Sequence, residues 1–361
     1  MSHLVIMLLL AQQQQARPAP TFEKLAAQAE AARQQDRIDD ALAFYRQALK
    51  LKPAWKEGWW FAGTLLYDKD KYAEAQPALN KLVELDPKNG PALALLGLCE
   101  YQTKDYGQAI IHLNRARLFG VGDNQQMVLV TLYHSAILLT KYKRYEQALE
   151  LILDIAKRGM NSPKIVDAAG LAALRMPILP GEIVEKDREL IQLTGRAVTM
   201  AGERHAAEAQ EAFEALIARF PKAANVHYVY GAFLMLNDPE EGLKQFQSEL
   251  DVSKDHLPAL VAIAFEYLKR GEPQKGLAYA GRAVQSAPES FAAHAALGRV
   301  LVDSGQVDEG IKRLEFAENL APDSPQVRIA LASAYAKAGR STDAARERAE
   351  FSKLKNSDGS K

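Results

Sequence analysis

Residues 56–89 read KEGWWFAGTLLYDKDKYAEAQPALNKLVELDPKN. Two helix-forming stretches flank the polar run Asp68–Lys71, and Pro87 ends the second stretch because the residue before a proline is driven out of the α region. Apolar and small residues from Trp59 to Leu66 follow one another at spacings of 3, 1 and 3, which places them on one helix face. This segment therefore predicts two helices joined by a tight turn.

The same pattern returns along the chain with a period of about 34 residues, a length typical of repeat proteins. Pro53 and Pro87 are separated by one such period, and so are Pro288 and Pro322. Small residues keep a constant register before the proline slots, at Gly63, Gly97 and Gly298. A fixed period of this kind indicates a stacked array of helix pairs, each too small to bury its own apolar face.

Small residues are expected where the two helices of a unit approach most closely. In the unit 56–89 these residues are Gly63 and Ala75. A larger side chain at either position would force the helices apart, at an overpacking cost of roughly 1–3 kcal/mol.

The pattern resembles the tetratricopeptide repeat, which has small residues at positions 8 and 20 and a proline at position 32. The resemblance implies an all-α fold, a right-handed superhelical solenoid of about ten helix–turn–helix repeats. The units that fit are 22–55, 56–89, 90–123, 129–162, 190–223, 224–256 (with one deletion), 257–290, 291–324 and 325–354.

Residues 163–189 depart from the repeat. A first helix is expected around Gly170, and the run Met176–Gly181 then breaks the chain before a helical stretch that merges into the next unit. We interpret the segment as a degenerate repeat that either kinks the superhelix or acts as a hinge between a first block, 22–162, and a second block, 190–354; an irregular loop without mechanical meaning is the alternative. Residues 355–361 are expected to form a disordered tail.

Residues 1–21 form an apolar segment followed by a linker. Seven apolar residues, Leu4–Leu10, precede a stretch rich in Gln, Pro and Ala. Seven residues lie at the lower edge for a signal-peptide core and are too few to span a membrane. The segment is interpreted as a signal peptide of an exported protein, periplasmic or secreted. Because no Lys or Arg precedes the apolar run, a cytoplasmic protein without a signal stays the alternative.

Composition and motifs argue against several functions. Lys plus Arg and Asp plus Glu number 45 each, so the net charge is zero, and a nucleic-acid partner, which favours a basic protein, is not expected. The single cysteine, Cys99, rules out an internal disulfide and a multi-cysteine metal site. The chain carries no Walker phosphate loop, G-x-S-x-G or H-E-x-x-H motif. We therefore expect no catalytic residue, no metal, no cofactor and no enzyme activity.

The resemblance also implies where a ligand would bind. In the family, the first helices of the repeats line a concave groove that commonly holds extended peptides. The matching positions give a mostly apolar channel with polar-tipped aromatic residues, which are enriched at binding hot spots. The predicted groove residues are Trp60, Thr64, Tyr67, Leu98, Tyr101, Tyr133, Ile137, Tyr228 and Phe265. The alternative is that these rings pack against neighbouring helices.

The sequence thus predicts a non-catalytic scaffold that binds a polypeptide segment of another protein in the groove. The Lys/Asn/Arg clamp that one subgroup of the family uses for acidic C-terminal peptides is absent, because Ala26, Trp60 and Ala94 stand at one of its positions. Two other functions stay open. The chain could be an architectural subunit of a cell-envelope or secretion complex that uses its convex face or ends, or an accessory subunit that regulates a separate enzyme. The sequence does not define the oligomeric state.

Overall fold

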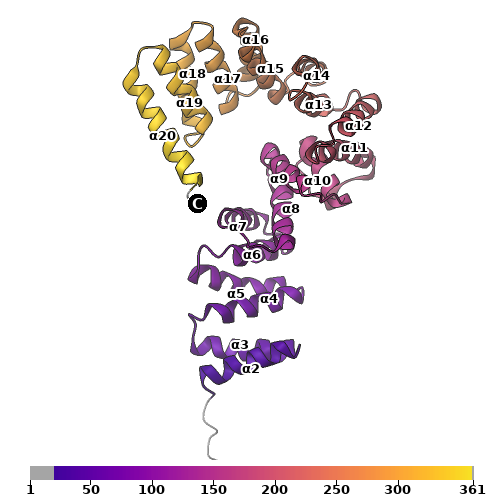
Figure 1. Cartoon of the computed structure of the whole chain (residues 1–361), viewed down its shortest axis with the longest axis vertical. Helices are drawn as coiled ribbons and strands as arrows, with labels where there is room; N and C mark the ends of the chain where they lie inside the picture. Colours follow the sequence, from indigo (N-terminus) through magenta and orange to yellow (C-terminus); the bar gives the residue numbers. More distant parts are fainter. Residues whose placement is uncertain (1–19, 360–361) are drawn as a thin grey trace, which may run out of the picture. The chain divides into compact units, whose positions relative to one another are not determined.

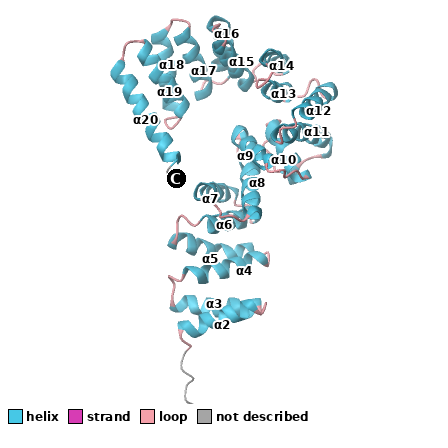
Figure 2. Ribbon diagram, viewed as in Figure 1, coloured by secondary structure: helices cyan, strands magenta, loops and turns pink. Residues whose placement is uncertain are grey.

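The computed structural model describes residues 20–359, and every regular element within that range is helical (Figure 2). Nineteen α-helices, α2 to α20, follow one another with short connections, and no strand occurs among the described residues. The chain divides into two compact units between His134 and Ser135, inside helix α8. The expected all-α repeat architecture is therefore confirmed.

The first unit contains three complete helix pairs, one for each of the predicted units 22–55, 56–89 and 90–123 (Figure 1). In each pair the two helices pack directly on one another. The helices are α2 (Phe22–Gln34), α3 (Ile38–Leu51), α4 (Lys56–Asp68), α5 (Tyr72–Leu85), α6 (Gly90–Gln102), α7 (Tyr106–Phe119) and the first part of α8 (Gln125–Lys141).

The second unit continues with the remainder of α8 and carries the rest of the array. Its helices are α9 (Tyr145–Lys157), α10 (Pro163–Ala173), α11 (Glu185–Gly202), α12 (Ala206–Arg219), α13 (Val226–Leu234), α14 (Pro239–Val252), α15 (Leu257–Lys269), α16 (Pro273–Ser286), α17 (Phe291–Asp303), α18 (Val307–Leu320), α19 (Pro325–Lys337) and α20 (Ser341–Gly359).

The turn inside every helix pair except α13–α14 uses one residue in the left-handed region of the backbone. Its φ is positive at positions one repeat period apart, at Asp36, Asp70 and Lys104 in the first unit and at Gly271, Gly305 and Gly339 in the second. Such a residue lets the chain leave one helix and enter the next within a short turn. The backbone conformation of these turns therefore repeats with the same period as the sequence.

The predicted small residues lie at the helix crossings. A Cβ atom on Gly63 would lie 2.7 Å from Cδ2 of Leu79, and one on Gly97 would lie 2.8 Å from Cγ of Leu113. Ala75 is completely buried. These close approaches confirm the packing role expected for the small positions.

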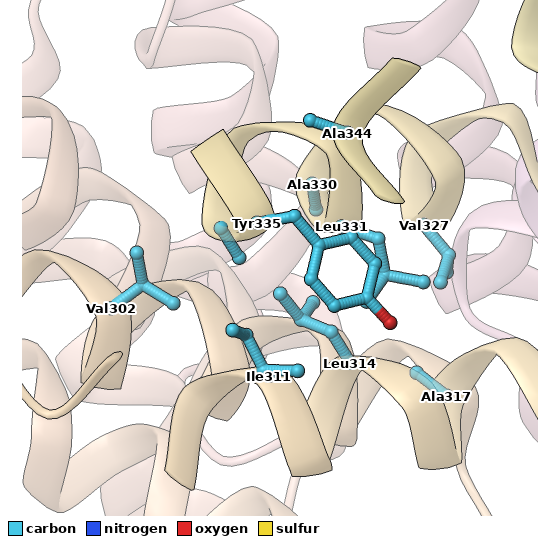
Figure 3. Packing of buried hydrophobic residues seen from close by; sticks show 10 residues of the cluster. Val302, Ile311, Leu314, Ala317, Val327, Ala330, Leu331, Tyr335 and Ala344 are labelled. Atoms are coloured by element: carbon cyan, nitrogen blue, oxygen red, sulfur yellow. The ribbon is translucent and has the colours of Figure 1, made fainter. Parts of the chain in front are cut away.

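Buried apolar side chains also join consecutive helix pairs. In the C-terminal cluster, Leu314 of α18 and Leu331 of α19 are fully buried and Tyr335 is nearly so, and Ala344 of α20 closes the cluster (Figure 3). Three consecutive helices therefore share one set of apolar side chains, as expected for an array whose units cannot bury their own faces alone.

The degenerate segment 163–189 belongs to the second unit. Helix α10 packs on α9 and α11, a short 3-10 turn covers Pro180–Glu182, and α11 then packs on both α10 and α12. A Cβ atom on Gly170 would overlap with the carbonyl oxygen of Ile191, and one on Gly195 would overlap with that of Val166. The helix around Gly170, the break and the merged helix are confirmed, whereas the hinge stays a prediction.

Helix α20 continues to Gly359, so the expected disordered tail is wrong for residues 355–359; Lys355–Asp358 contains no Pro or Gly that would end the helix earlier. Residues 360–361 and most of the predicted signal segment, 1–19, lie outside the described residues. None of the helices between residues 20 and 359 is long and apolar enough to cross a membrane.

Candidate functional site

Helix α4 carries three of the predicted groove residues, and all three are half-buried. The Thr64 hydroxyl donates to the carbonyl oxygens of Trp60 and Phe61, at 3.0 and 3.2 Å, so it is engaged by its own helix. The neighbouring Trp59 donates its ring N–H to the carbonyl oxygen of Pro53 at 2.8 Å. This bond fixes Trp59 at the repeat boundary, whereas the half-buried Trp60 lies about 100° further around the helix.

A tyrosine pair recurs in two successive repeats. The ring of Tyr67 lies 5.5 Å from that of Tyr72, and the ring of Tyr101 lies 5.5 Å from that of Tyr106. Both pairs connect the first helix of a repeat to its second helix, and burial raises the pKa of Tyr67. The rings therefore pack partly within their own repeats while remaining half-exposed.

His134 brings two predicted residues together in the first unit. Its ring centroid lies 4.7 Å from that of Tyr101 and 5.1 Å from that of Tyr133, in edge-to-face arrangements. Its Nδ1 atom lies 2.8 Å from the carbonyl oxygen of Val130, consistent with an Nδ1–H donor. His134 was not among the predicted groove residues, although its place directly after Tyr133 in a helix was the available signal.

Two predicted groove residues are core residues instead. Leu98 is 3% exposed and Ile137 is 2% exposed, so a ligand cannot reach either side chain in this structure. In α6, Gly90 and all residues of Ala92–Glu100 are buried. A helix that is apolar on all sides packs on all sides, and the sequence of α6 shows that feature.

In the second unit, Tyr228 and Phe265 are each covered by a neighbouring side chain. The Tyr228 ring lies 5.6 Å from Phe246 and 4.9 Å from His256, and burial raises its pKa. The Arg299 guanidinium lies 4.8 Å from the centre of the Phe265 ring. The structure thus places Tyr228 in a packed aromatic–imidazole cluster and Phe265 beneath a cation.

A buried polar network beside Tyr228 was also missed. Glu249 is completely buried, and its two carboxylate oxygens accept the backbone N–H groups of Asn225 and Tyr228, at 2.8 and 3.1 Å. Burial nevertheless raises the pKa of Glu249. The Asn225 side chain donates to the carbonyl oxygen of Leu174 at 3.0 Å and lies 2.9 Å from Nε2 of His256. Glu249 thereby caps α13, and Asn225 connects the degenerate repeat to α15.

The reactive side chains form no recognisable reaction centre among the described residues. Burial raises the pKa of the Cys99 thiol to about 12, so it stays protonated and unreactive at neutral pH. Nδ1 of His112 lies 2.8 Å from a carboxylate oxygen of Glu100, a contact between α7 and α6 that the linear spacing did not reveal. Within residues 20–359, no group of three or more His, Cys, Asp or Glu side chains is arranged to hold a metal ion.

Several solved structures are similar to all or part of this chain. A MamA fragment from Desulfovibrio magneticus is 18% identical, with a TM-score of 0.42, over 47% of this chain and 96% of that one. Yeast Tom70 is 14% identical, with a TM-score of 0.41, over 92% and 85%. YrrB, described as a TPR protein with an unusual peptide-binding site, is 17% identical, with a TM-score of 0.39, over 47% and 89%. No curated protein matches the chain.

Sequence models of the repeat match most of the array. Models described as tetratricopeptide repeat match residues 25–54, 62–122, 201–254, 261–311 and 295–349. The longest unmatched stretch of the array, 123–200, contains the degenerate segment 163–189. The matches cover more than half of the chain, which therefore belongs to the tetratricopeptide repeat family.

Proposed function

We propose that the protein is a non-catalytic scaffold that binds a polypeptide segment of another protein on the first helices of its first unit. The observation that carries the proposal is a set of half-exposed aromatic side chains on α4, α6 and α8. We call this set the first-helix surface, and it consists of Trp60, Tyr67, Tyr101 and Tyr133.

The packing of these rings prepares them for binding. The tyrosines are held by Tyr72, Tyr106 and His134, so little side-chain freedom is lost when a ligand covers their exposed parts. Rigid aromatic side chains with a polar tip combine a large apolar contact with a hydrogen bond. Such a surface suits an extended, partly apolar polypeptide.

The test is affinity capture from the native host, followed by mass spectrometry and by affinity measurement with the captured partner. The full chain is compared with Trp60→Ala and Tyr133→Ala. Loss of a hot-spot aromatic residue costs about 2 kcal/mol, or roughly 30-fold in affinity. The matched control is Tyr142→Ala, because Tyr142 is 47% exposed and lies outside the surface.

The outcomes separate the candidate functions. A partner that is lost from Trp60→Ala and Tyr133→Ala but retained by Tyr142→Ala supports the proposal, provided that the circular dichroism of each variant matches wild type. The same partners bound by all variants would assign binding to another surface and favour an architectural role. Unfolding of both variants would show that the rings belong to the core.

A further inference from the structure

Helix α13 is shorter than the first helices of the other well-formed repeats. It has nine residues, whereas α4, α6, α15, α17 and α19 each have thirteen. Four residues are about one helical turn. The backbone shows the same loss, because Arg204 has a φ of 65° but Asp238, one repeat period later, has a φ of −136°. Counted from their small residues, Gly231 and Gly298, α13 begins two residues later and ends two residues earlier than α17, so the first helix of repeat 224–256 is short at both ends.

This shortened helix borders a notch of about 670 Å³ between α12, α13 and α14. Ala206, Ala207 and Gln210, from the first turns of α12, line the notch together with Asn237 and Asp238, which follow α13. The volume lies within the range of about 300–1,000 Å³ typical of ligand sites. Ala206, Ala207 and Gln210 are exposed, so the first turns of α12 are open to solvent beside the shortened helix.

The floor of the notch is aromatic. The rings of Tyr230 and Phe233 lie 5.3 and 5.2 Å from the fully packed ring of Phe213. Directly beyond α13, Leu236 is 81% exposed, more than any other large apolar side chain in the described part of the chain. Apolar surface gathered at a concave site favours binding of an apolar group.

The rim of the notch is acidic. Glu214, Asp238 and Glu241 line it, and the described lining residues include no Lys, Arg or His. Glu241 is paired with Lys244 at 3.0 Å, so Glu214 and Asp238 provide the available negative charge. One oxygen of Glu214 accepts from Gln210 at 2.9 Å and from the Tyr230 hydroxyl at 3.4 Å, whereas its second oxygen accepts no hydrogen bond within residues 20–359.

We infer that this notch binds a segment of another protein in which a bulky apolar side chain stands next to a lysine or arginine. The apolar side chain rests on Phe233 and the exposed alanines of α12, and the cation lies by Glu214 and Asp238. The charge of the rim selects a basic partner. The notch is formed largely by the second helices α12 and α14, so the inference does not rest on the first-helix surface.

The probe is a phage-displayed library of random dodecapeptides, selected on the immobilised full chain. We expect the selected peptides to be enriched in Lys or Arg next to Leu, Ile, Phe or Trp. Synthetic copies are then measured by fluorescence anisotropy, beside copies in which Glu replaces each basic residue. Binding should weaken at least tenfold in the acidic copies and should also weaken with rising salt.

Two variants of the protein test the place of binding, each with a matched control on the same helix. Glu214→Lys reverses a rim charge and Ala207→Leu fills the notch; both should weaken binding at least tenfold. Glu211→Lys and Ala215→Leu make the same changes at exposed positions of α12 outside the notch, and should leave affinity unchanged.

Several results would overturn the inference. These are selection without the basic–apolar enrichment, equal losses in the control variants, and loss of peptide binding in Trp60→Ala, which would place the peptides on the first-helix surface. Light scattering that shows a dimer dissociated by Ala207→Leu would assign the notch to a second copy of this chain. None of these results overturns the proposed function, which is tested separately by the partner binding of Trp60→Ala and Tyr133→Ala.

Discussion

His256 shows how one residue can depend on its protonation state for its structural role. Its Nδ1 atom accepts the backbone N–H of Ala259 at 3.1 Å, while Nε2 lies 2.9 Å from the side-chain oxygen of Asn225. Both bonds form together only in the neutral Nε2–H tautomer. Burial, reinforced by the charge of Arg175, lowers the pKa of His256 to about 4. The ring therefore caps α15 in its uncharged form.

We predict that acid destabilises the second unit through this histidine. Because the folded pKa lies below the unfolded value of 6.5, the unfolded chain takes up the proton first, and stability is lost as the pH falls from about 6.5 towards 4. The loss at pH 4.5 is on the order of 2 kcal/mol. His256→Asn keeps an N-cap acceptor without titrating, so urea unfolding at pH 7 and 4.5 should show a smaller loss for the variant.

Glu249 opposes this effect and is present in both proteins. Its raised pKa means that stability is gained as the pH falls through the folded value, so only the difference between wild type and His256→Asn reports on the histidine. Parallel pH profiles for the two proteins would contradict the assigned role.

At the scale of elements, the crossing of α10 and α11 is the closest approach of two helices in the degenerate segment. Gly170 and Gly195 face carbonyl oxygens of the opposite helix, one in each direction. Two residues without a Cβ atom allow the backbones to meet. This close crossing holds α10 against the long helix α11, which also packs on α12.

We predict opposite effects for two glycine-to-alanine substitutions in helices. Gly170→Ala should lower the free energy of unfolding by about 1–3 kcal/mol, because its methyl group displaces the backbone of α11. Gly281→Ala, in α16, adds a methyl group with no heavy atom within 4 Å and should raise it by up to about 1 kcal/mol, through helix propensity. Thermal unfolding checks both, and shifts in the same direction would contradict the crossing argument.

On the scale of the whole molecule, each helix packs mainly on its neighbours in sequence, so a local change should have local consequences. At the C-terminal end, Arg328 of α19 contacts Glu318 of α18 and lies 2.8 Å from a carboxylate oxygen of Glu347 in α20. Glu347 is 1% exposed, and its other oxygen is paired with the surface residue Arg346. Arg328 therefore joins three consecutive helices.

We predict that Arg328→Met weakens the last three helices and leaves the first unit unchanged. Removal of one partner of a buried ion pair costs about 3 kcal/mol or more, and the buried Glu347 would keep only its pair with the surface residue Arg346. Hydrogen exchange should therefore accelerate in α18–α20 and stay at the wild-type rate in α2–α5. Arg313→Met breaks the exposed pair with Glu309 and should change little; faster exchange throughout the chain would contradict a nearest-neighbour array.

The repeat, the small residues at helix crossings and the break after Gly170 can be read from the amino-acid sequence, because each of these signals acts through local backbone conformation and within-repeat packing. The sequence also showed that unit 224–256 is a deletion variant. The packed structure was needed to show that Leu98 and Ile137 are buried, that His134 contacts both Tyr101 and Tyr133, and that Glu249 caps a helix from another element. Burial and capping depend on which surfaces meet when repeats stack, and residues far apart in sequence set that contact. The notch beside the shortened α13 depends on both, since its acidic rim comes from α12, from α14 and from the connection before α14.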